Sequence, residues 1–153
     1  MATELSATNP LSALKNAPAI SAGRANASDA ARPGIRLIQY LVLINLGLVA
    51  VQALSAGFLL SGYGIALAIH ADVALALQLG ALVQAIAAVI LWRRRRVPAW
   101  VAGASIGLFV IMFLQIGLGY SKRYWLHVPI GVGLFGGLIR QTARLRQLGT
   151  SDR

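Results

Sequence analysis

Long apolar stretches dominate this chain and limit what it can fold into. Residues 37–60 contain no charged side chain, residues 70–92 and 99–120 are nearly as apolar, and a shorter stretch begins at residue 125. A helix of about 20 apolar residues crosses a bilayer, and in lipid a helix satisfies its own backbone hydrogen bonds. The pattern predicts an all-α integral membrane four-helix bundle with spans at about 37–60, 70–92, 99–120 and 125–144.

The composition agrees with a membrane protein and excludes several other classes. Hydrophobic residues make up 58% of the chain and charged residues only 12%, about half the charged fraction of a soluble protein. The formal net charge is +10, but the arginines cluster at the ends of the apolar stretches, which argues against nucleic-acid binding. The chain has no cysteine, and this excludes thiolate metal sites, disulfides and covalently attached haem.

The basic residues predict the orientation in the membrane. They precede the first stretch, fill the loop at 93–96 and follow the fourth stretch, whereas the other two loops contain only Lys122 and Arg123. By the positive-inside rule both termini are expected in the cytoplasm, in a multi-pass protein of a cell membrane, here expected to be the bacterial inner membrane. The bundle would occupy residues 34–146, between a disordered cytoplasmic N-terminal tail at 1–33 and a C-terminal tail at 147–153.

The chain has two histidines, and each stands near the start of a predicted span: His70 at the second and His127 at the fourth. With short connections the second and fourth helices run parallel, so both imidazoles are expected at the same depth near the outer side. Two facing imidazoles in an apolar bundle are the axial ligands that a b-type haem takes. The sequence therefore predicts His70 and His127 as iron ligands; the alternative is two unrelated histidines near the membrane interface.

Four further residues are candidates for contacts with that cofactor. Ala74 and Gly131 each follow a histidine by one helical turn on the same face, where a flat macrocycle requires small side chains. Lys122 and Arg123 are predicted on the outer side against the general trend, and they would pair with the haem propionates. The alternative for this basic pair is contact with lipid headgroups.

Other polar and small residues are expected to have structural roles. Asp72 is expected to cap the second helix, where the helix dipole favours an acid. Three glutamines, Gln52, Gln84 and Gln115, are expected to form a hydrogen-bonded layer between helices. Two small-xxx-small pairs are expected to let helices of the bundle approach closely: Gly103 with Gly107, and Gly133 with Gly137.

From His70 to Arg146 the chain resembles one four-helix half of the haem A synthases. The likeness rests on a histidine before a basic loop with a proline (HADVALALQLGALVQAIAAVILWRRRRVPAW), a Leu-Gln and glycine pattern (LQIGLGY) and a second histidine (WLHVPIGVGLFGG). The synthases are similar to a fusion of two such halves, and they carry a glutamate and an arginine where this chain has Leu67 and Ala71; their outer-loop cysteine pair is also missing here. The resemblance implies the fold and the haem-ligand role of the two histidines, but not the methyl-hydroxylating activity.

These observations predict a haem b-binding membrane protein that serves electron transfer or haem handling, rather than a stand-alone enzyme. A bis-histidine iron has no open coordination site, which suits one-electron transfer. A single haem near one face would need a quinol, a redox partner protein, or a second haem in a homodimer or larger membrane complex. The alternative is a haem-free accessory or assembly subunit that binds partner helices. A small transporter is less favoured, because charges inside the spans are almost lacking.

Overall fold

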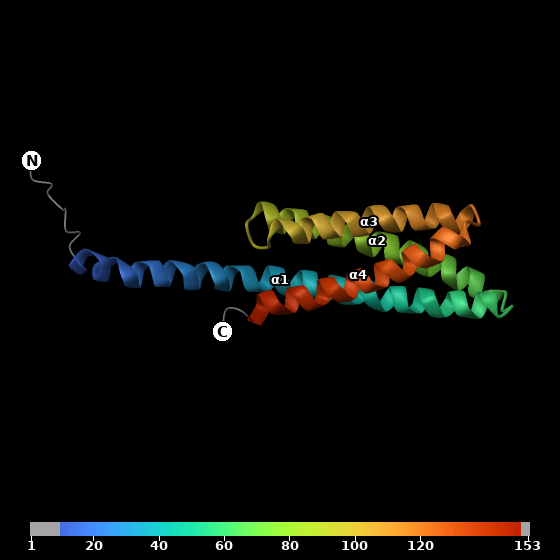
Figure 1. The fold of residues 1–153 in the computed structure, drawn as a ribbon, viewed down its shortest axis with the longest axis horizontal. Coiled ribbons are helices and arrows are strands. Elements are labelled where there is room, and N and C mark those ends of the chain that lie inside the picture. Colours follow the sequence, from blue (N-terminus) through green and yellow to red (C-terminus); the bar gives the residue numbers. More distant parts are fainter. Residues whose placement is uncertain (1–9, 151–153) are drawn as a thin grey trace, which may run out of the picture.

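The computed structural model describes residues 10–150, with side chains described for 33–149. Every described element is an α-helix (Figure 1). The four helices are α1 (Pro10–Leu60), α2 (Ile65–Arg93), α3 (Ala99–Tyr120) and α4 (Tyr124–Thr150). The prediction of an all-α chain with four helices is therefore confirmed.

The helices form a ring of neighbours joined by short turns. α1 packs on α2 and α4, and α3 packs on the same two helices from the other side. The turns at 61–64 and 121–123 lie at one end of the bundle, which we call the histidine end (Figure 1). The turn at 94–98 and the last turns of α4 lie toward the opposite end, which we call the arginine end.

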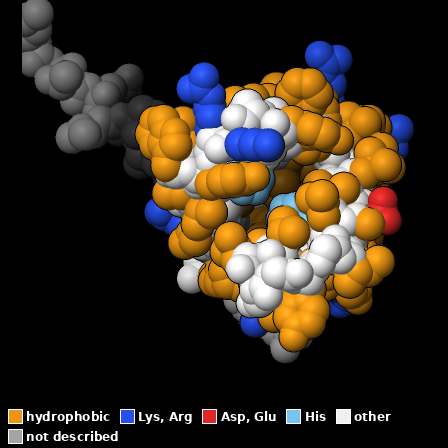
Figure 2. Space-filling model, turned by 90° about the vertical axis from the view of Figure 1, so that its right-hand side faces the viewer, with side chains coloured by type: hydrophobic (Ala, Val, Ile, Leu, Met, Phe, Trp, Pro, Cys, Tyr) orange, Lys and Arg blue, Asp and Glu red, His pale blue; other side chains and the backbone are white. Residues whose placement is uncertain are grey.

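The bundle has a narrow apolar core and an apolar surface. Core side chains such as Ile38, Val42, Val101 and Leu138 are almost completely buried between the helices. Many other large apolar side chains lie exposed on the outside, and hydrophobic side chains cover much of the histidine end as well (Figure 2). Exposed apolar surface on this scale fits lipid rather than water as the surrounding solvent.

Three helices are long and apolar enough to cross a membrane: the part of α1 from Pro33 to Leu60, α2, and α3. These helices indicate a membrane protein. Within the described residues α4 does not meet the same standard, because Arg140, Arg144 and Arg146 follow its apolar first half. A fourth span at 125–144 therefore stays a prediction.

Two helices begin earlier than the sequence predicted. α2 begins at Ile65, because the apolar residues before His70 continue the helix without a break, and Asp72 consequently lies inside it. The prediction that Asp72 caps this helix is wrong: the N-cap is Gly64, and no side chain caps the helix there. α1 begins at Pro10 and so includes residues 10–33 of the expected tail, a segment with many alanines, the residue of highest helix propensity. Residues 1–9 and 151–153 lie outside the described part of the chain, so the tails expected there stay predictions.

The first three helices end in turns of the same type. Each turn places one residue in the left-handed region: Gly62 (φ 89°), Arg95 (φ 56°) and Lys122 (φ 55°). The following N–H returns to a carbonyl five residues earlier, as from Arg123 to Leu118 at 3.0 Å, which is the Schellman ending. This backbone region usually holds glycine and costs another residue about 1–2 kcal/mol, so the chain places Lys122 at a strained position of the histidine end.

A buried polar chain crosses the middle of the bundle. Asn45 of α1 donates from Nδ2 to Gln84 Oε1 of α2 (2.9 Å), and Gln84 donates from Nε2 to Ser105 Oγ of α3 (3.1 Å). All three side chains are at most 1% exposed. The predicted layer of three glutamines is therefore wrong in its membership. Gln84 joins this central chain, whereas Gln52 and Gln115 donate hydrogen bonds near the histidine end, because their positions along the helices place them at another level.

The small-xxx-small pairs do not pack the helices of this chain together. A Cβ built at Gly103, Gly107, Gly133 or Gly137 would have no neighbouring atom within 4 Å, apart from the glycine's immediate chain neighbours and the adjacent backbone of its own helix. The prediction that these glycines bring helices of the bundle into close approach is wrong for that reason. The close approach occurs instead at Gly80, where a Cβ would lie 2.5 Å from Asn45 Oδ1.

Candidate functional site

The two histidines lie side by side at the histidine end. The ring centroids of His70, on α2, and His127, on α4, are 6.2 Å apart, and the ring planes make an angle of 54°. Both side chains are half-buried. Figure 2 looks onto this end and shows the histidine side chains in the wall of a hollow that hydrophobic side chains surround. The structure thus brings together two imidazoles from residues 57 positions apart in sequence, each from a different helical hairpin.

Hydrogen bonds at Nδ1 determine which ring nitrogen of each imidazole carries the proton. His127 Nδ1 lies 3.0 Å from the carbonyl oxygen of Gln115, which can only accept, so Nδ1 is the donor. His70 Nδ1 lies 2.9 Å from Ser55 Oγ. The serine hydroxyl donates its own hydrogen to the carbonyl of Gln52 (2.9 Å), so it accepts from the imidazole. In both rings Nε2 therefore keeps its lone pair, the form of imidazole that binds a metal.

The two halves of the site repeat one arrangement. Gln52 of α1 donates from Nε2 to the carbonyl of His70 on α2 (3.0 Å), and Gln115 of α3 donates from Nε2 to the carbonyl of His127 on α4 (2.9 Å). In each hairpin the outgoing helix thus holds both the backbone and the ring of the histidine on the returning helix. A ligating histidine is usually fixed in this way by a hydrogen bond from its second nitrogen to a carbonyl or another acceptor.

The separation of the rings is compatible with one metal ion shared by the two Nε2 atoms. A metal–nitrogen bond of about 2.0 Å and about 1.1 Å from that nitrogen to the ring centre, counted on both sides, give a centroid separation of about 6 Å. The observed value is 6.2 Å. The described residues contain no group of three or more His, Cys, Asp or Glu side chains that could hold a metal ion by themselves. Asp72, two residues from His70, is exposed on α2.

The other predicted site residues have varied surroundings. Lys122 and Arg123 are exposed in the turn before α4, and the carbonyl of Arg123 accepts the backbone N–H of His127 (3.0 Å). Ala74 is half-buried one turn after His70. Gly131 has a different neighbour from the one expected: a Cβ there would lie 3.1 Å from Nε2 of Gln115, so this glycine makes room for the amide that bonds to the carbonyl of His127.

Sequence reasoning missed two residues that position the histidines. Ser55 fixes the tautomer of His70, and Gly119 lies against the other ring, where a Cβ would be 3.4 Å from His127 Cε1. Ser55 stands three residues after Gln52, one turn further along α1, and this spacing was the available indication. Gly119 belongs to the LQIGLGY segment, but the pattern does not tell which of its two glycines contacts a neighbour; Gly117 faces open space.

Comparisons of the chain with protein-family models, with curated proteins and with solved structures give no match. The resemblance to one half of the haem A synthases accordingly stays a prediction.

Proposed function

We propose that this protein binds haem b between His70 and His127 and serves one-electron transfer or haem handling in the membrane. The observation that carries the proposal is the pair of rings 6.2 Å apart, each with Nδ1 in a hydrogen bond that leaves the Nε2 lone pair for a metal.

Haem fits this donor set better than a bare metal ion does. Zinc or non-haem iron needs three or four protein ligands, and the described residues provide no such group. A porphyrin would supply four nitrogens of its own, so His70 and His127 would be the two protein ligands that a haem still needs. The bound group would supply reversible one-electron chemistry, and the protein's part is to hold both imidazoles in one tautomer.

The surroundings of the pair support the same proposal. The hollow at the histidine end is bordered by hydrophobic side chains (Figure 2), and Lys122 and Arg123 lie in the turn directly before α4. We assign the two propionates of the haem to this basic pair, because charge-assisted bonds to carboxylates are the strongest available there. Ala74 is a small residue one turn after His70, and Gly131 makes room for the Gln115 amide that bonds to the carbonyl of His127.

The location completes the proposal. We place the protein in the bacterial inner membrane with four spans, α4 included, and with both termini cytoplasmic. Arg140 and Arg144 would then extend toward the headgroups beyond the short apolar part of α4. The histidine end would then lie near the outer face, so a haem held there would exchange electrons with a quinol, a redox protein or a second copy of the chain.

The test is the absorption spectrum of the purified, haem-supplemented protein in detergent. The wild type should show a low-spin, six-coordinate b-type spectrum on reduction. His70→Ala and His127→Ala should each convert it to a high-spin or haem-free spectrum, and added imidazole should restore the low-spin form. Asp72→Ala, two residues from one ligand but exposed, is the matched control and should keep the wild-type spectrum.

A wild type without any such band would favour the second candidate, a haem-free accessory subunit. One observation supports this alternative: four glycines of the small-xxx-small pairs have open space at Cβ and thus offer smooth helix faces to other chains. The histidines would then serve only as links between the helices of each hairpin, and their alanine variants would lower thermal stability without any spectral change.

A further inference from the structure

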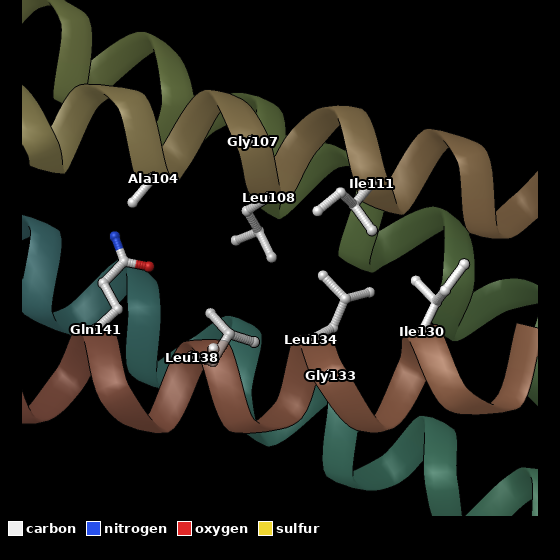
Figure 3. A pocket seen from close by; sticks show the side chains of 10 residues that line it. Ala104, Gly107, Leu108, Ile111, Ile130, Gly133, Leu134, Leu138 and Gln141 are labelled. Carbon is white, nitrogen blue, oxygen red and sulfur yellow. The ribbon is translucent and has the colours of Figure 1, made fainter.

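A groove runs between α3 and α4, away from the histidine pair. It encloses about 370 Å³, within the range of about 300–1,000 Å³ that small-molecule sites occupy. Its walls are almost entirely apolar, with Leu108 and Ile111 on α3 and Leu134 and Ile130 on α4 (Figure 3). The groove therefore suits an apolar ligand that enters from the lipid.

Glycines keep the groove open. Gly107 lines it from α3, and Gly133 and Gly137 line it from α4. A Cβ at any of the three would meet no neighbouring side chain or facing helix within 4 Å, so these positions leave space that larger residues would fill without a clash. This space is what distinguishes the α3–α4 contact from the tight contact of α1 and α2 at Gly80.

One polar group lies inside the groove without a partner. Gln141 is only 6% exposed, and its Nε2 has no hydrogen-bond partner. Figure 3 shows the amide at the end of the groove, with its nitrogen directed toward Ala104 on α3. A buried amide donor that lacks an acceptor is costly, so the missing component is an oxygen acceptor at this end of the groove.

Positive charge lies beyond the same end. The guanidinium of Arg144 is held over the Trp100 ring, 5.7 Å from its centroid, and Arg140 is exposed one residue before Gln141. Along α4 the order is thus apolar walls, then the amide donor of Gln141 with Arg140 next to it in sequence, then the guanidinium of Arg144 toward the arginine end. A glycerophospholipid has the same order: an acyl chain, an ester carbonyl and a phosphate.

We propose that the α3–α4 groove is a binding site for an anionic phospholipid, with one acyl chain along the groove and an ester carbonyl on Gln141 Nε2. The phosphate would lie near Arg140 and Arg144, which complement its charge. The lining of α4 from Ile130 to Gln141 spans roughly 16 Å at 1.5 Å per residue, close to half of the bilayer core of about 30 Å. One chain of one leaflet therefore fits this length.

The groove fits a lipid better than a helix of another protein. A partner helix uses its backbone carbonyls in its own hydrogen bonds, whereas a phospholipid brings both a free ester carbonyl for Gln141 and a negative charge for the arginines. This inference is independent of the haem proposal, because the groove does not involve the histidine pair, and the haem spectrum is recorded in parallel.

Native mass spectrometry of the full chain in detergent tests the inference, with phosphatidylglycerol in ester-linked and ether-linked forms and with phosphatidylcholine. The wild type should prefer ester-linked phosphatidylglycerol. Gly133→Leu should weaken its binding by about tenfold or more by filling the groove. Gly136→Leu, on the same helix and outside the groove, is the matched control and should bind as the wild type does.

Two further variants test the polar end. Gln141→Leu should bind the ester and ether forms equally, a loss of about three- to fivefold in preference, which corresponds to one hydrogen bond in a membrane. Arg144→Gln should reduce the preference for phosphatidylglycerol over phosphatidylcholine. Equal lipid binding by Gly133→Leu and Gly136→Leu would overturn the site. Dissociation of a dimer by Gly133→Leu without loss of lipid would also overturn it and assign the groove to a second copy of the chain.

Discussion

The contact between Gly80 and Asn45 allows a sharp test of the central polar chain. In Gly80→Ala the new Cβ would lie 2.5 Å from Asn45 Oδ1 and 3.4 Å from Asn45 Cγ. The asparagine amide has to move, and it then loses its bond to Gln84 Oε1, which is 2.9 Å long in the wild type. The substitution should therefore destabilise the bundle although it adds only a methyl group.

The expected loss of unfolding free energy in Gly80→Ala follows from two limits and one correction for helix propensity. The lower limit is the loss of one buried hydrogen bond, about 1 kcal/mol, and the upper limit is an overpacked contact that cannot relax, about 3 kcal/mol. Alanine gains up to about 1 kcal/mol over glycine in helix propensity. Gly47→Ala measures this gain alone, because a Cβ at Gly47 meets nothing within 4 Å. We expect Gly80→Ala to be less stable than Gly47→Ala by about 1–3 kcal/mol.

The assay is reversible unfolding in mixed micelles of a mild detergent and dodecyl sulfate, followed by circular dichroism. A double-mutant cycle isolates the contact. In the Asn45→Ala background, Gly80→Ala should cost nothing further, so the coupling energy should equal the full penalty of about 1–3 kcal/mol. Two results would refute the reasoning from this contact. One is an equal unfolding free energy for Gly80→Ala and Gly47→Ala, and the other is a penalty for Gly80→Ala that persists in the Asn45→Ala background.

Three further predictions concern the histidine end and the topology. Ser55→Ala removes the acceptor for Nδ1 of one histidine and should weaken haem binding about 10–100-fold in a haem titration; unchanged affinity would show that the hydroxyl does not tune the ligand. Gly131→Leu should displace the glutamine amide that lies 3.1 Å from its Cβ position and lose haem, whereas Gly137→Leu, with open space, should keep it; difference spectra of the two proteins decide this. A reporter fused after Arg153 should behave as cytoplasmic and one inserted at Gly62 as external, and the reverse pattern would contradict the proposed orientation.

The helices and the meeting of the histidines are predictable from the sequence, because these depend on the length of the apolar stretches and of the connections between them. His70 and His127 come together since two short turns make α2 and α4 neighbours of the same helices. The partners of the rings were not predictable in this way. Ser55 accepts from one ring and a backbone carbonyl from the other, and which of the two occurs depends on the rotation of each helix about its axis.

The predictions that are wrong also depend on how the helices are placed and where they begin. The sequence predicts the wrong hydrogen-bond layer for Gln84, because it specifies the order of polar residues but not their relative heights across antiparallel helices. It also predicts packing within the bundle for the glycine pairs, since such a pattern shows where a helix can be approached but not by what. Asp72 lies inside α2 and does not cap it, because the apolar residues from Ile65 extend the helix past the start that the sequence predicts.

The repeated glutamine–histidine arrangement also has a thermodynamic consequence. Each hairpin carries one imidazole with its own set of hydrogen bonds, so neither hairpin alone provides a two-ligand site. A ligand that bridges the rings binds only when the hairpins are docked, and its binding free energy becomes docking energy, about 4 kcal/mol at a free concentration of 1,000 times Kd. Such a ligand would in this way add to the packing and hydrogen bonds that already dock the two hairpins.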